Sequence, residues 1–173
     1  MFGPRGIAIN SKGLIYVTDT GNKYIRVFNS NLEPLSSFGG EGSLPGKFNE
    51  PVGIAIDSSD NIYVADTGNS RIQKFNSEGK YLEEYPTRKP LPKDFFSMQP
   101  YLEVFSDGRI VWTASSYGEF WVLNIISKKY SVFKIDKNKI SKPIGVTIDN
   151  KDNLWLSDKS IGIIYFINRK VLK

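Results

Sequence analysis

The sequence has 173 residues, of which 40% are hydrophobic and 24% are charged, a composition typical of a folded domain with its own core. It contains neither Cys nor His, which excludes disulfides, thiolate chemistry, and both the commonest zinc ligand and the commonest general base. The net charge of +5 is compatible with an anionic partner, and no apolar run approaches the about 20 residues that a membrane span requires. The sequence shows no signal peptide, and it leaves the cellular compartment open.

Two segments of the chain are copies of one pattern. Residues 4–30 return as residues 51–77, and 17 of these 27 positions are identical. A weaker third copy occupies residues 143–168. Repeats of 40–50 residues are typical of proteins in which one supersecondary unit is stacked several times. Such units form binding surfaces more often than active sites.

Each of the first two copies predicts four short strands. Segments rich in β-branched and aromatic residues alternate with turn sequences such as Ser-Lys-Gly, Thr-Gly-Asn and Ser-Glu-Gly. The expected strands are residues 6–10, 14–20, 24–29 and 34–38 in the first copy, and 53–57, 61–67, 71–76 and 81–85 in the second. No segment has a sustained helical period, so we expect helices of no more than a turn or two.

The first strand of each copy has small residues on one face and large ones on the other. Gly6 and Ala8 alternate with Ile7 and Ile9, and the second copy repeats this alternation. Small residues fit the crowded inner strands of radially arranged sheets, while the nearly continuous apolar second strands predict sheets covered on both faces. The sequence therefore predicts an all-β fold, a β-propeller of four-stranded antiparallel blades, with about four blades in an open or incomplete arc.

The second half of the chain keeps the strand pattern but loses much of the repeat. A Pro-rich crossing at residues 86–100, which we expect Phe95 and Phe96 to anchor, leads to a degenerate third unit. The fourth unit supplies strands at 145–149, 154–158 and 163–168 and stops where its fourth strand should begin. We expect one propeller domain, or a fragment of one, over residues 1–173. Its expected blades are approximately residues 4–39, 51–86, 100–136 and 143–173.

The repeated residues resemble the NHL-repeat family. The resemblance rests on PVGIAID (residues 51–57), NIYVADTGN (61–69), SRIQKF (70–75) and the linker GKFNEP (46–51). It implies a β-propeller, commonly of six blades, so that four blades would form part of a larger ring. The sequence departs from the family at Lys23 and Ser70, where a His is frequent, and at Ala114, where the turn Asp would fall.

An acid recurs at the end of the second strand of three units, as Asp19, Asp66 and Asp158. Because a catalytic site is needed once, three copies of an acid indicate a structural role. We expect each carboxylate to accept hydrogen bonds from backbone N–H groups of the following turn. Glycine there would supply a positive φ, and Arg71 would pack its stem between blades while reaching an acceptor. The predicted structural turn residues are Asp19, Gly21, Asn22, Asp66, Gly68, Asn69, Arg71 and Asp158.

Three further groups of residues have both a functional and a structural interpretation. Acids and amides cluster in two hairpins and could ligate calcium, although hairpin turns favour the same residues. Aromatic residues of the third unit could stack on sugars or bases, or fill the core. A run of lysines could bind nucleic acid, or protect sheet edges. The groups are Asp57, Asp60 and Asn61 with Asp149, Asn150, Asp152 and Asn153; Tyr101, Phe105, Trp112, Tyr117, Phe120 and Trp121; and Lys128, Lys129, Lys134, Lys137, Lys139 and Lys142.

We therefore expect a non-enzymatic scaffold that binds a protein partner through loops on one propeller face, without catalytic residues, cofactor or metal, and with the binding face unknown. An alternative is single-stranded RNA binding through a basic propeller face. The resemblance implies a third alternative, a fragment of a propeller enzyme of the lyase or lactonase type. An open arc would bare two apolar blade faces. Remaining blades of a larger chain, a partner protein, or oligomerisation through the open blade edges would then complete the ring; the alternative is a closed ring of four blades.

Overall fold

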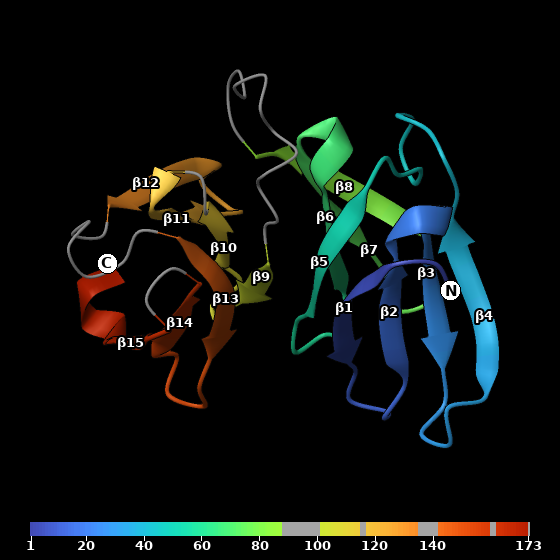
Figure 1. The fold of residues 1–173 in the computed structure, drawn as a ribbon, viewed down its shortest axis with the longest axis horizontal. Helices are drawn as coiled ribbons and strands as arrows, with labels where there is room; N and C mark the ends of the chain where they lie inside the picture. The colour runs from blue at the N-terminus through green and yellow to red at the C-terminus, as the bar shows by residue number, and fades with distance from the viewer. Residues whose placement is uncertain (88–100, 115–116, 135–141, 160–161, 173) are drawn as a thin grey trace. The chain divides into compact units, whose positions relative to one another are not determined.

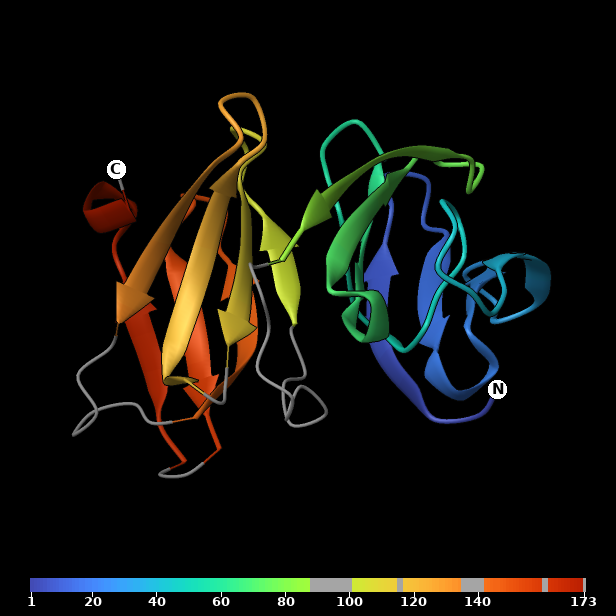
Figure 2. The same cartoon turned by 90° about the horizontal axis from the view of Figure 1, so that it is seen from above.

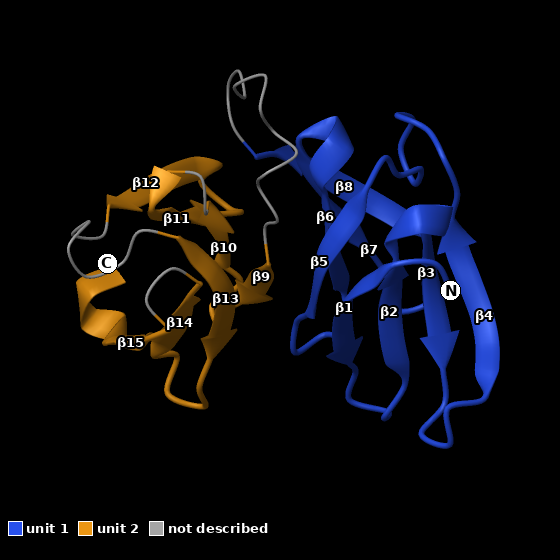
Figure 3. Ribbon diagram, in the orientation of Figure 1, with its two compact units in different colours: residues 1–96 blue, residues 97–173 orange. Residues whose placement is uncertain are grey.

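The computed structural model describes residues 1–87, 101–114, 117–134, 142–159 and 162–172, which form antiparallel β-sheets joined by short loops (Figure 1). The chain divides into two compact units, Met1–Phe96 and Ser97–Lys173 (Figure 3). Each unit contains two sheets of consecutive strands, so the all-β propeller-blade fold predicted from the sequence is confirmed. Over the described residues, no helix has the length and apolar character needed to cross a membrane.

Unit 1 contains the first two blades, and both have four strands in sequential order. The strands of blade 1 are β1 (Pro4–Ile9), β2 (Ile15–Asp19), β3 (Tyr24–Phe28) and β4 (Pro34–Gly39). Those of blade 2 are β5 (Pro51–Ile56), β6 (Ile62–Asp66), β7 (Arg71–Phe75) and β8 (Tyr81–Pro86). Every strand end lies within two residues of its predicted position, because the turn residues between the copies mark the boundaries closely.

Unit 2 contains blades 3 and 4. Blade 3 consists of β9 (Leu102–Val104), β10 (Ile110–Ala114), β11 (Glu119–Asn124) and β12 (Lys129–Lys134). Blade 4 consists of β13 (Pro143–Ile148), β14 (Leu154–Asp158) and β15 (Ile164–Ile167), followed by the 3-10 helix η5 (Arg169–Leu172). The described part of blade 4 thus has three strands, as predicted. Residues 88–100 of the crossing, Phe95 and Phe96 included, lie outside the described residues.

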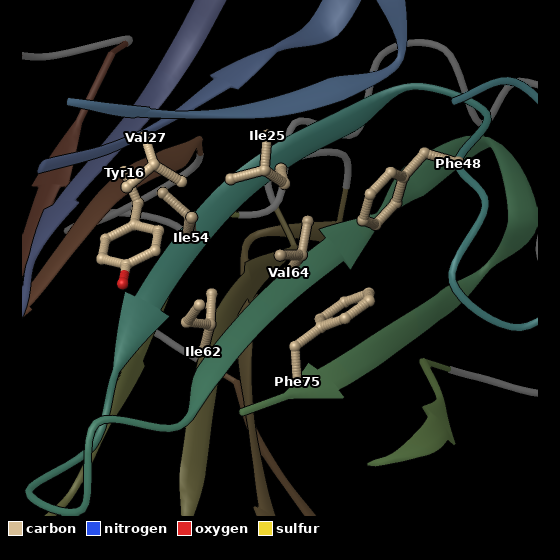
Figure 4. Close-up of a cluster of buried hydrophobic side chains, with 8 residues drawn as sticks. All are labelled: Tyr16, Ile25, Val27, Phe48, Ile54, Ile62, Val64 and Phe75. Carbon is tan, nitrogen blue, oxygen red and sulfur yellow. The ribbon is translucent and has the colours of Figure 1, made fainter. Parts of the chain in front are cut away.

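The core of unit 1 lies between its two blades, with β1 beside β5 (Figures 1 and 2). We call the face of a blade that contacts the next blade its trailing face, and the face that contacts the previous blade its leading face. The trailing face of blade 1 and the leading face of blade 2 form one buried cluster (Figure 4). The cluster consists of Tyr16, Ile25 and Val27 from blade 1, Ile54, Ile62, Val64 and Phe75 from blade 2, and Phe48 from the connection between them.

Close approach of the two blades explains the small residues of the first strand. A Cβ on Gly6 would lie 2.5 Å from the carbonyl oxygen of Val52 in β5 and 3.1 Å from a methyl group of Ile54. The hydroxyl of Thr18 sits in the same contact, accepting from the N–H of Gly6 (2.7 Å) and donating to the carbonyl of Val52 (2.9 Å). The crowding predicted from the sequence is therefore present between β1 and β5.

The core of unit 2 lies between blades 3 and 4. Phe105, Val111 and Phe120 of blade 3 pack with Leu154 and Leu156 of blade 4. Blade 3 stacks its aromatic side chains in pairs: the ring centroids of Phe120 and Phe133 are 4.8 Å apart, and those of Trp112 and Trp121 are 6.1 Å apart. Phe105, Trp112, Phe120 and Trp121 are buried, as the core interpretation predicted, whereas Tyr101 and Tyr117 are half-buried.

Candidate interaction surface

The recurring acid joins the end of the second strand to the start of the first strand in the same blade. Asp19 accepts a hydrogen bond from the N–H of Phe2 (2.6 Å), just before β1. In blade 2, Asp66 accepts from the N–H of Asn49 (2.8 Å), just before β5, and in blade 4 Asp158 accepts from the N–H of Lys142 (2.7 Å). The predicted acceptor role is realised, but in blades 1 and 2 the backbone donors come from the strand entry and not from the turn.

The glycine of the Thr-Gly-Asn turn has a different role from the one predicted. The turn forms short 3-10 helices, η1 (Thr20–Asn22) and η2 (Thr67–Asn69), and the left-handed residues that end them are Lys23 and Ser70, with φ of 64° and 57°. The expectation of a positive φ at Gly21 and Gly68 is therefore wrong. Glycine is required because the strand entry passes too close for a side chain: a Cβ at position 21 would lie 2.6 Å from the carbonyl oxygen of Phe2.

Cationic and amide side chains complete the coordination of each acid. The amide of Asn22 donates to Asp19 (3.0 Å), as does Nε of Arg26 (2.9 Å). Asp66 accepts from the amide of Asn69 (2.8 Å), from Nε of Arg71 (2.9 Å) and from the amide of Gln73 (3.2 Å). These donors occupy the carboxylate oxygens of Asp19 and Asp66, so both acids are engaged in structural hydrogen bonds.

Asp19 and Asp66 differ in the direction in which the fold shifts their pKa. Burial raises the pKa of Asp19, but hydrogen bonds from Asn22, Phe2 and Arg26 outweigh it, so the pKa lies below its ordinary value. Burial raises the pKa of Asp66 above its ordinary value despite the donors around it. The connection between the blades contacts the turn of blade 2 through the amide of Asn69, whereas the turn of blade 1 contacts the backbone of Phe2 and, through the hydroxyl of Thr20, the carbonyl of Pro51.

Arg71 fastens this connection to blade 2. Its side chain is 9% exposed, and it bridges Asp66 to Glu84, which lies 2.8 Å from Nη1. Nη2 donates to the backbone carbonyls of Leu44 (3.0 Å) and Lys47 (2.8 Å). An arginine is suited to this position because its planar guanidinium can donate to several acceptors at once.

Residues 41–47 form a loop between blades 1 and 2 that we call the linker loop. Its backbone is held at several points: the amide of Asn69 donates to the carbonyl of Gly42 (2.9 Å), and Gln73 both donates to the carbonyl of Lys47 (2.8 Å) and accepts from the N–H of Gly46 (2.8 Å). In contrast to this anchored backbone, the side chain of Leu44 at the tip is 72% exposed. The loop is thus a fixed backbone that presents an apolar side chain to solvent.

The first acid of each acidic hairpin accepts hydrogen bonds from its own turn. Asp57 accepts from the backbone N–H of Ser59 and Asn61 (both 2.9 Å), and Asp149 makes the same turn with Lys151 and Asn153. Within the ranges that the structure describes, no group of three or more acidic side chains lies close enough together to hold a metal ion. The carboxylates of Asp57 and Asp149 therefore stabilise their own turns.

The last acid of each hairpin instead joins neighbouring blades. Asp60 of blade 2 accepts from both the N–H (2.9 Å) and the hydroxyl (2.6 Å) of Ser11 in blade 1. Asp152 of blade 4 accepts from the same two groups of Ser106 in blade 3, with 3.0 Å to the N–H. We call this pair of bonds the serine clasp. Gly13 and Gly108 stand at the acid's position in blades 1 and 3, so the sequence alternates between glycine and aspartate.

Two lysines of the predicted basic run lie on one sheet edge. Lys129 and Lys134 are exposed at the two ends of β12, the edge strand of blade 3, and Nζ of Lys134 lies 3.9 Å from Glu119. Lys137 and Lys139 lie outside the described residues. Lysine on an edge strand disfavours pairing with another sheet, so this placement agrees with the structural interpretation.

Sequence reasoning missed both the linker loop and the serine clasp. The loop was visible only as a Gly-rich connection, since its rigidity depends on Arg71 and Gln73 folding back on it from blade 2. A signal for the clasp was present in the alternation of Gly13, Asp60, Gly108 and Asp152 at one hairpin position. Its meaning required the facing Ser11 and Ser106, whose proximity to these acids is a property of the packed blades.

Comparison with known proteins agrees with the architecture. A model of the NHL repeat matches residues 3–28 and 48–75, and no curated protein sequence matches the chain significantly. Similar solved structures include catalytically inactive virginiamycin B lyase from Staphylococcus aureus with quinupristin, Kuenenia stuttgartiensis hydrazine synthase and the WD40 repeats of RRP9. In that order, identities are 19%, 11% and 15%, and TM-scores are 0.68, 0.72 and 0.65.

The structural matches concern the fold. They cover 95%, 98% and 87% of this chain but only 55%, 47% and 42% of the three solved chains, so this chain spans about half the length of these structures. At such low identities the likeness describes the architecture alone. The family model, by contrast, matches the repeat turns and first strands described above. Residues 3–28 and 48–75 therefore match the NHL repeat, and the chain is built from β-propeller blades.

Proposed function

We propose that this chain is a non-enzymatic scaffold that binds a protein partner through the linker loop. The observation that carries the proposal is the contrast between the anchored backbone of residues 41–47 and the exposed side chain of Leu44 at its tip. A binding interface can be built around an aromatic or aliphatic anchor side chain that enters a pocket of the partner. A loop already fixed in its bound shape loses less conformational entropy on binding.

The acids of the repeat turns support a non-enzymatic role. General acid–base catalysis by a carboxylate requires an oxygen within hydrogen-bond reach of a substrate. Asp19 and Asp66 instead direct their oxygens to the strand entry, an asparagine and an arginine of the same blade. The similar structures include both a lyase and WD40 repeats, so the fold by itself does not choose between catalysis and binding.

The test places a photo-activated cross-linker, p-benzoylphenylalanine, at position 44 in cells of the source organism. The matched control carries the same group at position 82, because Leu82 is also exposed, at 47%, but lies in strand β8 of blade 2. We expect a discrete cross-linked protein from position 44 that is absent from position 82. We further expect Leu44→Asp to abolish co-purification of that protein. Equal cross-linking at both positions, or none at position 44, would contradict the proposal.

Single-stranded RNA binding remains a second candidate because Lys129 and Lys134 are exposed on one edge strand. Binding of a random RNA pool at 50 mM salt that falls steeply by 200 mM salt would favour it, since released counterions make such contacts salt-dependent. A propeller-enzyme fragment is the third candidate. Metal analysis of the purified chain tests that alternative directly, and stoichiometric zinc or calcium would favour it over the scaffold.

A further inference from the structure

Blade 1 has an apolar leading face that is exposed. Ile7 and Ile9 of β1 are 66% and 62% exposed, and Ile15, Val17 and Phe28 beside them are partly exposed. Ile7, Val17 and Phe28 line a hollow of about 520 Å³ on this face. A contiguous apolar patch of this kind is typical of an interface.

Blade 2 shows what such a face packs against. The strand registers of blades 1 and 2 are the same. Ile7, Ile15 and Val17 are therefore equivalent to Ile54, Ile62 and Val64. Ile9 and Phe28 have equivalents in blade 2 in the same way. The five pairs of equivalent residues, Ile7 and Ile54, Ile9 and Ile56, Ile15 and Ile62, Val17 and Val64, and Phe28 and Phe75, are identical in residue type. In blade 2 this face is packed against the trailing face of blade 1. The leading face of blade 1 is therefore shaped for the trailing face of another blade.

The chain itself carries an exposed trailing face, on blade 4. Ile164 is 68% exposed and Phe166 is 50% exposed, and the ring of Phe166 lies 5.0 Å from that of Trp155. By register, Trp155 and Phe166 correspond to Tyr16 and Val27, and Ser157 and Ile164 correspond to Thr18 and Ile25. The residues of blade 1 at these positions are buried against blade 2.

A hydroxyl group recurs near the end of the second strand of blades 1, 3 and 4, at Thr18, Thr113 and Ser157. Within unit 1, Thr18 donates to the carbonyl of Val52 in the next blade (2.9 Å), and within unit 2, Thr113 donates to the carbonyl of Ile144 (3.0 Å). Ser157 is the equivalent hydroxyl of blade 4, and like Thr18 it accepts the N–H of the glycine in its own first strand, here Gly145 (3.1 Å). The carbonyl equivalent to that of Val52 belongs to Arg5 of blade 1.

We propose that the trailing face of blade 4 in one copy of this chain binds the leading face of blade 1 in a second copy. Trp155, Ile164 and Phe166 cover Ile7, Val17 and Phe28, and the hydroxyl of Ser157 donates to the carbonyl of Arg5. The interface is heterologous, since it joins two different surfaces. Because Asn150 and Gly13 stand where the serine clasp would form, this contact lacks the clasp that joins blades 1 and 2.

The first experiment measures the mass of the 173-residue chain by sedimentation velocity at about 1 to 100 μM, the range of weak to moderate protein association. We expect mass to rise with concentration. Ile7→Asp and Ile164→Asp, each at an exposed side chain, should both weaken association at least about tenfold, because each would bury an unpaired charge. Leu35→Asp is the matched control: Leu35 is exposed on β4, and its counterpart Leu82 stays exposed on blade 2 although that blade has a neighbour. Thermal melts establish that each variant is folded.

Mixing distinguishes this contact from a symmetric one. Ile7→Asp retains an intact blade 4 and Ile164→Asp an intact blade 1, so their mixture should form a heterodimer although each alone is monomeric. The double variant should stay monomeric. A gain of function follows from the clasp: Gly13→Asp with Asn150→Ser should strengthen association, since Asp60 and Asp152 already adopt a positive φ at this position. A chain that stays monomeric at 100 μM, or association insensitive to both Ile7→Asp and Ile164→Asp, would overturn the proposal.

Discussion

Blades 1 and 2 have nearly the same sequence but different surroundings. Their equivalent strands have the same lengths, and their turns form the same 3-10 helices. The five apolar residues of their leading faces are identical in type. In blade 2 these five residues are buried or half-buried in the packed junction with blade 1. In blade 1 the same residues are exposed or partly exposed.

The comparison separates what a repeat specifies from what its neighbour adds. Local sequence sets the strands, the turns and the choice of apolar face, and it does so equally in both blades. Burial, and with it most of the stabilisation by the apolar side chains, depends on the adjoining blade. Equivalent substitutions in the two blades should therefore have unequal effects, and the size of the inequality measures the contribution of the neighbour.

The largest difference is expected for the arginines that pair with the turn acids, which share this role but stand at different register positions, Arg26 opposite Val17 and Arg71 opposite Asp66. Arg71→Ala leaves Asp66 buried without its cation and releases the carbonyls of Leu44 and Lys47, so we expect a loss of about 3–5 kcal/mol in the free energy of unfolding. Arg26→Ala should cost about 1 kcal/mol, because the side chain of Arg26 is 34% exposed and solvent screens its pair with Asp19. Urea unfolding followed by circular dichroism provides both values. Equal losses would contradict the difference in burial.

An apolar pair provides the next largest difference. Ile62→Ala removes a side chain that is fully buried in the junction and should destabilise the protein by about 2–4 kcal/mol through lost burial and the cavity left behind. Ile15→Ala at the equivalent position should cost about 1 kcal/mol or less, because part of that side chain is already in water. Both unfolding curves are measured at 1 μM to limit association between chains. A large loss from Ile15→Ala would show that the leading face of blade 1 is covered.

The glycines of the two turns give a smaller difference. In Gly68→Ala the new methyl group would overlap the backbone carbonyl of Asn49, which Asp66 and the linker loop hold in place, so we expect a loss of about 2–3 kcal/mol. Gly21→Ala would meet mainly the exposed ring of Phe2, which can turn away, and its methyl group would lie 2.6 Å from the nearest carbonyl oxygen, which is farther than at position 68. Its cost should be about 1 kcal/mol. Thermal melts of both variants test the order, and a more damaging Gly21→Ala would reverse our account of the two strand entries.

The sequence predicted the features that depend on local residues and missed those that depend on contacts between distant segments. Every strand of blades 1 and 2 was predicted, because alternating apolar residues and Gly- or Asn-containing turns are local signals. The role of Gly21 and Gly68 was wrong, because the close approach of Phe2 and Asn49 is a contact between segments far apart in the chain. For the same reason, the anchoring of the linker loop by Gln73 could not be derived from spacing alone. Local sequence patterns therefore predict the strands and turns, whereas the structure of the linker loop depends on tertiary contacts.

The turn acids offer the smallest and most specific difference, a pH dependence of opposite sign. The pKa of Asp19 is lowered in the folded state, so its ionised form stabilises the protein near neutral pH, and this stabilisation disappears as the pH falls through the folded pKa. The pKa of Asp66 is raised by burial, so the folded state binds a proton more readily than the unfolded state. Its ionisation costs stability near neutral pH, and the cost is relieved as the pH falls toward the ordinary carboxyl range. We therefore expect the stability difference between wild type and Asp19→Asn to shrink on acidification, and that between wild type and Asp66→Asn to change in favour of wild type. Urea unfolding at a series of pH values from 7 to 3 measures both, and parallel slopes for the two variants would show that burial does not distinguish the two turns.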